Sequence, residues 1–174
     1  MVRILLAALL LTLPGIGARA QNAAPPALTR HGNWVEGRVG SAGREGCIAG
    51  TPAPGRGSLQ VTVGRTPAMG VILVLAVQLE RTTFGGPEAV RFTVDGNVTE
   101  MPGQPNPGGP AMLVAAATED EARKLSDLLL AMQRGRNLRV QVGSRPVLEL
   151  SLSGASAALG AMRSCAQQVG MMPR

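Results

Sequence analysis

Residues 59–77 read LQVTVGRTPAMGVILVLAV, two apolar segments separated by a short stretch that contains proline and glycine. Over residues 59–63 leucine and valine alternate with glutamine and threonine, which is the period of a half-buried β-strand. Residues 65–70 are typical of a turn. Residues 71–77 are continuously apolar and rich in β-branched side chains, so they predict a central strand that is covered on both faces.

Strand patterns recur along the rest of the chain. Trp34, Val35 and Val39 predict a first short strand, with the only tryptophan in the core. Asp95-Gly96 tolerates the positive φ angles of a tight turn and therefore predicts a hairpin between residues 90–94 and 97–100. The remaining predictions are strands at residues 112–117, 138–142 and 148–152, and loops rich in proline and glycine at residues 51–57 and 101–110.

Two helices are predicted late in the chain. Thr118 and Glu121 have the spacing of a capping box, and Gly135 can end that helix in a left-handed conformation. Ser153 can cap a second helix that ends at Gly170. About eight short strands with two helices in the C-terminal half indicate an α+β fold, mainly an antiparallel β sandwich or a partly closed barrel.

The N-terminus has the grammar of a signal peptide. Arg3 precedes an apolar run at residues 4–13, and Ala18-Arg19-Ala20 offers small residues for cleavage between Ala20 and Gln21. A membrane anchor needs about 20 apolar residues, roughly twice this run. We therefore expect a signal peptide at residues 1–20, a flexible leader at residues 21–32 and a single β-rich domain at residues 33–174. The mature protein should be periplasmic or secreted and should not span a membrane.

The two cysteines, Cys47 and Cys165, are expected to form a disulfide, because an exported protein folds in an oxidising compartment. A closed loop of 118 residues would stabilise the fold by about 4 to 5 kcal/mol on the chain-entropy model. A metal site lacks ligands, since the only histidine is His31 in the leader. No metal or other cofactor is expected.

Charge argues against a nucleic-acid partner. The formal net charge is +6, and removal of Arg3 and Arg19 with the signal peptide leaves +4. The basic residues are scattered, and the chain has only one tryptophan, two phenylalanines and no tyrosine to stack on bases.

The sequence gives little support for any catalytic residue. Residues 154–158, GASAA, approach a nucleophile elbow around Ser156, but alanine replaces the final glycine and no histidine follows residue 31. Glu119, Asp120 and Glu121 are explained by the positive end of the helix dipole. No catalytic residue is assigned, and we expect a protein that is not an enzyme.

The closing segment, residues 147–165, reads VLELSLSGASAALGAMRSC and resembles the end of the invasion-associated locus B family and of related uncharacterised exported proteobacterial proteins. The preceding passage, QRG at residues 133–135 followed by LRVQV at residues 138–142, resembles the same family, as does the early Trp34 followed by Cys47. The resemblance implies an exported, non-enzymatic, β-rich protein of the cell envelope, and it assigns no binding residue.

Three functions remain open from the sequence. The first is an interaction module that binds an unidentified envelope component or protein through loops such as residues 101–110. The second is an envelope hydrolase that uses two carboxylates, whose spacing depends on the fold. The third is an inhibitor of lysozyme-type enzymes, which the positive charge disfavours because the target is also basic.

Overall fold

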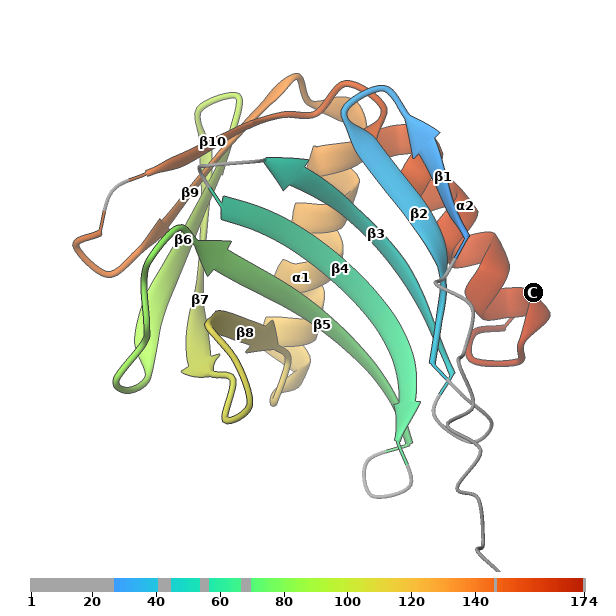
Figure 1. The fold of residues 1–174 in the computed structure, drawn as a ribbon, viewed down its shortest axis with the longest axis horizontal. Coiled ribbons are helices and arrows are strands. Elements are labelled where there is room, and N and C mark those ends of the chain that lie inside the picture. The colour runs from blue at the N-terminus through green and yellow to red at the C-terminus, as the bar shows by residue number, and fades with distance from the viewer. Residues whose placement is uncertain (1–26, 41–44, 54–56, 67–69, 146, 174) are drawn as a thin grey trace, which may run out of the picture.

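The fold is one antiparallel sheet with two helices on one of its faces (Figure 1). The computed structural model describes residues 27–40, 45–53, 57–66, 70–145 and 147–173. The strands are β1 (Leu28–His31), β2 (Trp34–Val39), β3 (Gly46–Ala53), β4 (Gly57–Thr66), β5 (Gly70–Leu79), β6 (Glu88–Val94), β7 (Asn97–Pro105), β8 (Ala111–Ala115), β9 (Asn137–Val142) and β10 (Leu148–Ser151). The helices are α1 (Glu119–Arg134) and α2 (Ala155–Gln168).

The predicted antiparallel, β-rich fold with two C-terminal helices is confirmed, but a sandwich or a partly closed barrel is not. The described strands form a single ten-stranded sheet in the order β1-β2-β3-β4-β5-β8-β7-β6-β9-β10, and this sheet is open. Its two ends approach each other where residues near β2 bond to residues at the end of β10. Trp34 Nε1 donates to Ser151 O at 3.0 Å, and Asn33 N donates to Ser153 O at 3.0 Å.

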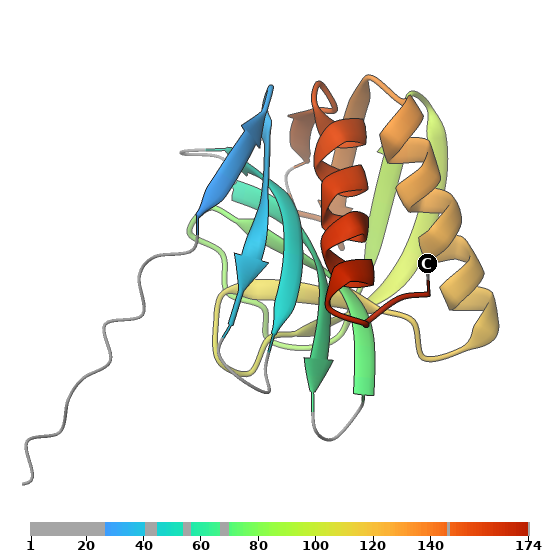
Figure 2. The same ribbon diagram turned by 90° about the vertical axis from the view of Figure 1, so that its right-hand side faces the viewer.

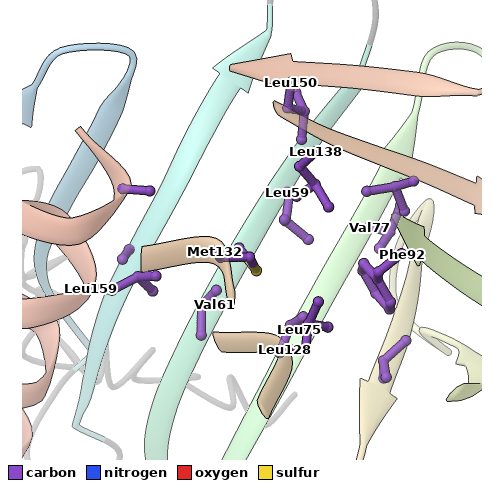
Figure 3. Packing of buried hydrophobic residues seen from close by; sticks show 14 of the residues in the cluster. Leu59, Val61, Leu75, Val77, Phe92, Leu128, Met132, Leu138, Leu150 and Leu159 are labelled. Atoms are coloured by element: carbon purple, nitrogen blue, oxygen red, sulfur yellow. The ribbon is translucent and has the colours of Figure 1, made fainter. Parts of the chain in front are cut away.

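Both helices lie on the same side of the sheet, which we call its inner face (Figure 2). α2 packs on β1 to β4, whereas α1 packs on β6, β7 and β8 and against α2. Figure 3 shows Leu128 and Met132 of α1 in the same buried cluster as Val61, Leu75 and Phe92 of the sheet. Each fully buried leucine or phenylalanine stabilises the fold by about 1.5 to 3 kcal/mol, so this cluster is the main source of stability.

The predicted disulfide joins the sheet to the second helix. Cys47 lies in β3 and is fully buried, Cys165 lies in α2, and their Cα atoms are 6.0 Å apart. The bond crosses 118 residues of sequence. The disulfide therefore holds α2 against the N-terminal strands of the sheet.

The prediction that residues 71–77 are covered on both faces is wrong. Leu75 and Val77 point to the inner face and are fully buried, whereas Ile72 and Val74 point to the outer face and are partly exposed. The strand is central, with four strands on one side of it and five on the other. Its outer face stays open because both helices pack on the inner face.

The predicted loop at residues 101–110 is also wrong in part, because β7 continues to Pro105. Pro102 lies opposite Ala89 of β6, and Ala89 O accepts a hydrogen bond from Gly143 N. Ala89 thus directs its backbone groups away from β7. The missing N–H of Pro102 interrupts no bond between β6 and β7, so this proline can lie within a strand.

Several helix and strand boundaries differ from the predicted ones. The Thr118–Glu121 capping box is confirmed, but Gly135 has φ −79° rather than a left-handed conformation. A side chain at Gly135 would meet Leu152 Cδ1 and Ala131 O at 3.0 Å, so close packing explains this glycine. The residue that precedes α2 is Gly154, with φ 93°, and not Ser153. β3 extends to Ala53, into the loop predicted at residues 51–57.

The N-terminal predictions fall mostly outside the described residues. These include the signal peptide at residues 1–20, the cleavage point between Ala20 and Gln21, and residues 21–26 of the leader. The last part of the predicted leader differs from a flexible segment, because residues 28–31 form β1 and pair with β2.

Breaking the disulfide should weaken the fold without changing its topology. We expect the Cys47→Ala/Cys165→Ala double variant to lose about 4 to 5 kcal/mol of unfolding free energy, because the denatured chain regains the freedom of a 118-residue loop. Urea denaturation of the oxidised protein, the reduced protein and the double variant measures this. Equal midpoints for all three would contradict a stabilising bond.

Candidate functional site

The outer face of the sheet is divided into two regions of different chemistry. Cross-strand register identifies which residues point outward, because paired residues share a face. On β2, β3, β4, β5 and β8 none of the outward residues is charged, and we call this region the neutral face. It includes Val35, Gly37, Val39, Gly46, Ile48, Gly50, Ser58, Gln60, Thr62, Gly64, Ile72, Val74, Ala76, Gln78, Ala111, Leu113 and Ala115.

The outward residues of β6, β7, β9 and β10 form the second region, which we call the ion-pair face. Arg91 lies directly opposite Glu100, with Nη2 3.0 Å from Oε2. Arg139 lies directly opposite Glu149, with Nε 3.2 Å from Oε1. Exposed cross-strand pairs of this kind contribute about 0.2 to 1 kcal/mol each and keep a face well hydrated.

A shallow hollow of about 450 Å³ lies at the β1 to β4 end of the neutral face. Arg30, Val35, Gly50 and Gln60 are partners in consecutive strand pairs, so they form one row across β1 to β4. Gly50 has no side chain, which leaves space in this row. The residues that line the hollow are Leu28, Arg30, Val35, Ile48, Gly50, Thr51, Ser58, Leu59 and Gln60.

Close approach of the backbone explains why position 50 is a glycine. A Cβ atom at Gly50 would lie 2.8 Å from Leu59 O and 3.3 Å from Gln60 Cα. Both are backbone atoms of β4, so neither can rotate away. The hollow is therefore a consequence of how tightly β3 and β4 approach.

Among the residues that the structure describes, Arg30 is the only charged one that lines the hollow, and it forms no ion pair with another of them. Gln60 directs its amide along β4, where Nε2 donates to Thr62 Oγ1 at 2.9 Å. The rest of the lining is mainly Leu28, Val35 and Ile48. The hollow thus combines an apolar floor with a single cation at its β1 side.

Several carboxylates of the described residues are held by cations or by backbone N–H groups. Glu88 pairs with Arg145, whose guanidinium also lies over the Phe84 ring at 4.9 Å. Asp95 accepts hydrogen bonds from the backbone N–H groups of Arg136 and Asn137, both at 2.9 Å. The sequence predicted Asp95 only as a turn residue, because its bond to β9 spans more than 40 positions.

The acidic first turn of α1 is explained by its own helix. Lys124 Nζ donates a hydrogen bond to Asp120 at 2.8 Å. This contact holds the pKa of Asp120 below its usual value and raises the pKa of Lys124. Arg123 lies 3.8 Å from Glu119. Ser156 is exposed on α2, and His31 Nε2 is 3.9 Å from Glu36 Oε1. Within the described residues no three side chains of the types that bind metals come together.

Comparison with known proteins identifies no relative of this chain. The chain matches no protein-family model, no curated protein and no solved structure. Neither α1 nor α2, the helices of the described part of the chain, is long and apolar enough to cross a membrane. Fold and surface together define a β-rich protein with one disulfide and a neutral face beside an ion-pair face.

Two glycines of the neutral face test the origin of the hollow. We expect Gly50→Ala to lower the unfolding free energy by about 1 to 3 kcal/mol, because its methyl group meets the β4 backbone. Gly64→Ala is the matched control on β4, where the nearest atom is 3.8 Å away. That change should be neutral or stabilising by about 0.4 to 1 kcal/mol, since alanine has fewer conformations in the unfolded chain. Urea denaturation that ranks the two variants the other way would refute the explanation.

Proposed function

We propose that this chain is the precursor of an exported, non-enzymatic protein that acts by binding a component or a protein of the bacterial cell envelope, in the periplasm or outside the cell. The neutral face is the binding surface. The resemblance of residues 147–165 to the invasion-associated locus B family supports the same class of function.

The support for export comes from two separate parts of the chain. Residues 1–20 have a basic start, an apolar run and small residues before Gln21, which is the grammar of a cleaved signal peptide. The Cys47–Cys165 bond is of the kind that persists in oxidising compartments. The two features lie in different parts of the chain, and each supports export by a different physical argument.

The observation that carries the binding proposal is the division of the outer face. Water surrounds both regions equally, yet all the charged outward residues of the sheet from β2 to β10 lie on the ion-pair face. A face without charge over five neighbouring strands differs from an ordinary hydrated surface, and we take it as the surface that meets a partner. The loop predicted for binding, residues 101–110, is a less suitable candidate because β7 continues through Pro105.

The alternatives have less support. A carboxylate hydrolase needs one acid free to donate a proton and a second acid within about 5 to 10 Å. Glu88, Glu100 and Glu149 are each engaged by an arginine instead. An inhibitor of lysozyme-type enzymes would have to overcome repulsion between two basic proteins.

Mass spectrometry tests the exported state. After periplasmic expression in a Gram-negative host, we expect a mass that begins at Gln21 and no alkylation of the cysteines until the protein is reduced. The physical reason is that cleavage and oxidation both require passage across the inner membrane. An uncleaved chain with both thiols free would overturn the proposal.

Enzyme assays test the non-enzymatic part. The purified mature protein should neither hydrolyse peptidoglycan, esters or peptides nor slow a lysozyme assay. Hydrolysis that a single Glu→Gln change or Ser156→Ala abolishes would contradict the proposal and show that the protein is an enzyme. Inhibition of lysozyme would establish the third function instead.

A further inference from the structure

We infer that the hollow on the neutral face binds a long-chain carboxylate, with the carboxylate at Arg30 and the alkyl chain over Val35, Ile48 and Gly50. The inference rests on the proposed function, because it names the chemical class of the ligand for the same surface. It follows from the charge of the hollow, its size and the shape of the face around it.

The charge of the hollow favours a ligand with an anionic group. Among the described residues, Arg30 is the only charged one in the lining, and it has no ion-pair partner there. The neutral face beyond it offers no second cation. One guanidinium matches one carboxylate, with which it can form two parallel hydrogen bonds. A phosphate monoester carries up to two negative charges, and the second would stay unpaired.

The size and the continuation of the hollow suit an alkyl chain. Its volume of about 450 Å³ lies within the range of about 300 to 1,000 Å³ that is usual for small-molecule sites. The row of residues that starts at Arg30 continues from Gln60 to Ala76 and Leu113. These neutral side chains provide a track across the sheet along which a longer chain can lie.

Two other occupants fit less well. The sheet curves around the helices, so its outer face bulges outward (Figure 2). Two convex faces make a small contact area, whereas a stable interface buries roughly 800 Å² per partner. A bilayer needs protruding apolar and aromatic side chains. Among the outward residues from β1 to β5 and β8, the only large apolar side chain that is strongly exposed is Leu28, at 50%.

Isothermal titration calorimetry of the mature protein tests the inference, with sodium dodecanoate kept below its critical micelle concentration. We expect saturable 1:1 binding that Arg30→Glu weakens at least tenfold. The same variant should gain at least tenfold affinity for dodecyltrimethylammonium, because the hollow then carries a negative charge. Leu28→Glu should also weaken dodecanoate binding tenfold or more. The matched control is Val98→Glu, at a position that is 60% exposed on the ion-pair face, and it should bind like the wild type.

Three results would overturn the inference. The first is no saturable binding of dodecanoate. The second is equal binding by wild type and Arg30→Glu when their urea midpoints agree, and the third is binding of dodecyl phosphate or phosphatidylglycerol vesicles in preference to dodecanoate. Mass spectrometry of the same preparation keeps the two proposals apart. A cleaved, oxidised protein that does not bind dodecanoate refutes the ligand and leaves the exported binding protein intact.

Discussion

Two helices cover one face of a ten-stranded sheet, and the other face of every strand must therefore be compatible with water. β5 illustrates the constraint, because Leu75 and Val77 are fully buried while Val74 and Ala76, the residues that alternate with them, are partly exposed. An antiparallel sheet tolerates this arrangement, whereas a parallel sheet is usually covered on both faces. The chemistry of the outer face is thus free to be set by something other than the core.

On the ion-pair face, charged side chains make the surface compatible with water. Arg91 and Glu100 on one strand pair, and Arg139 and Glu149 on another, are solvated and contribute only modestly to stability. The neutral face instead presents glycine, threonine, glutamine and half-buried aliphatic residues to water. Hydration alone accounts for the first face. It does not account for the lack of charge over five strands of the second, which is why a ligand is the more economical explanation.

The sequence predicted what depends on near neighbours. Alternation identified the inner residues of β4, and the capping box identified the start of α1, since both patterns span only a few positions. The sequence did not reveal what depends on pairing partners. Gly135 is explained by Leu152, 17 positions away, and Pro102 by Ala89, 13 positions away. The hollow depends on a row whose two ends, Arg30 and Gln60, are 30 positions apart. The order of the last strands, with β8 beside β5, has no local signal either.

The disulfide and the hollow are parts of one arrangement. Leu28 and Arg30 lie in β1, a four-residue edge strand that pairs only with β2. β2 in turn is held by β3, by α2 and by the bond from Trp34 Nε1 to Ser151 O. Cys47 of β3 and Cys165 of α2 join the two supports on which β2 rests. The disulfide therefore does more than stabilise the fold, because it also fixes the strands that give the hollow its shape and that hold Arg30 beside it.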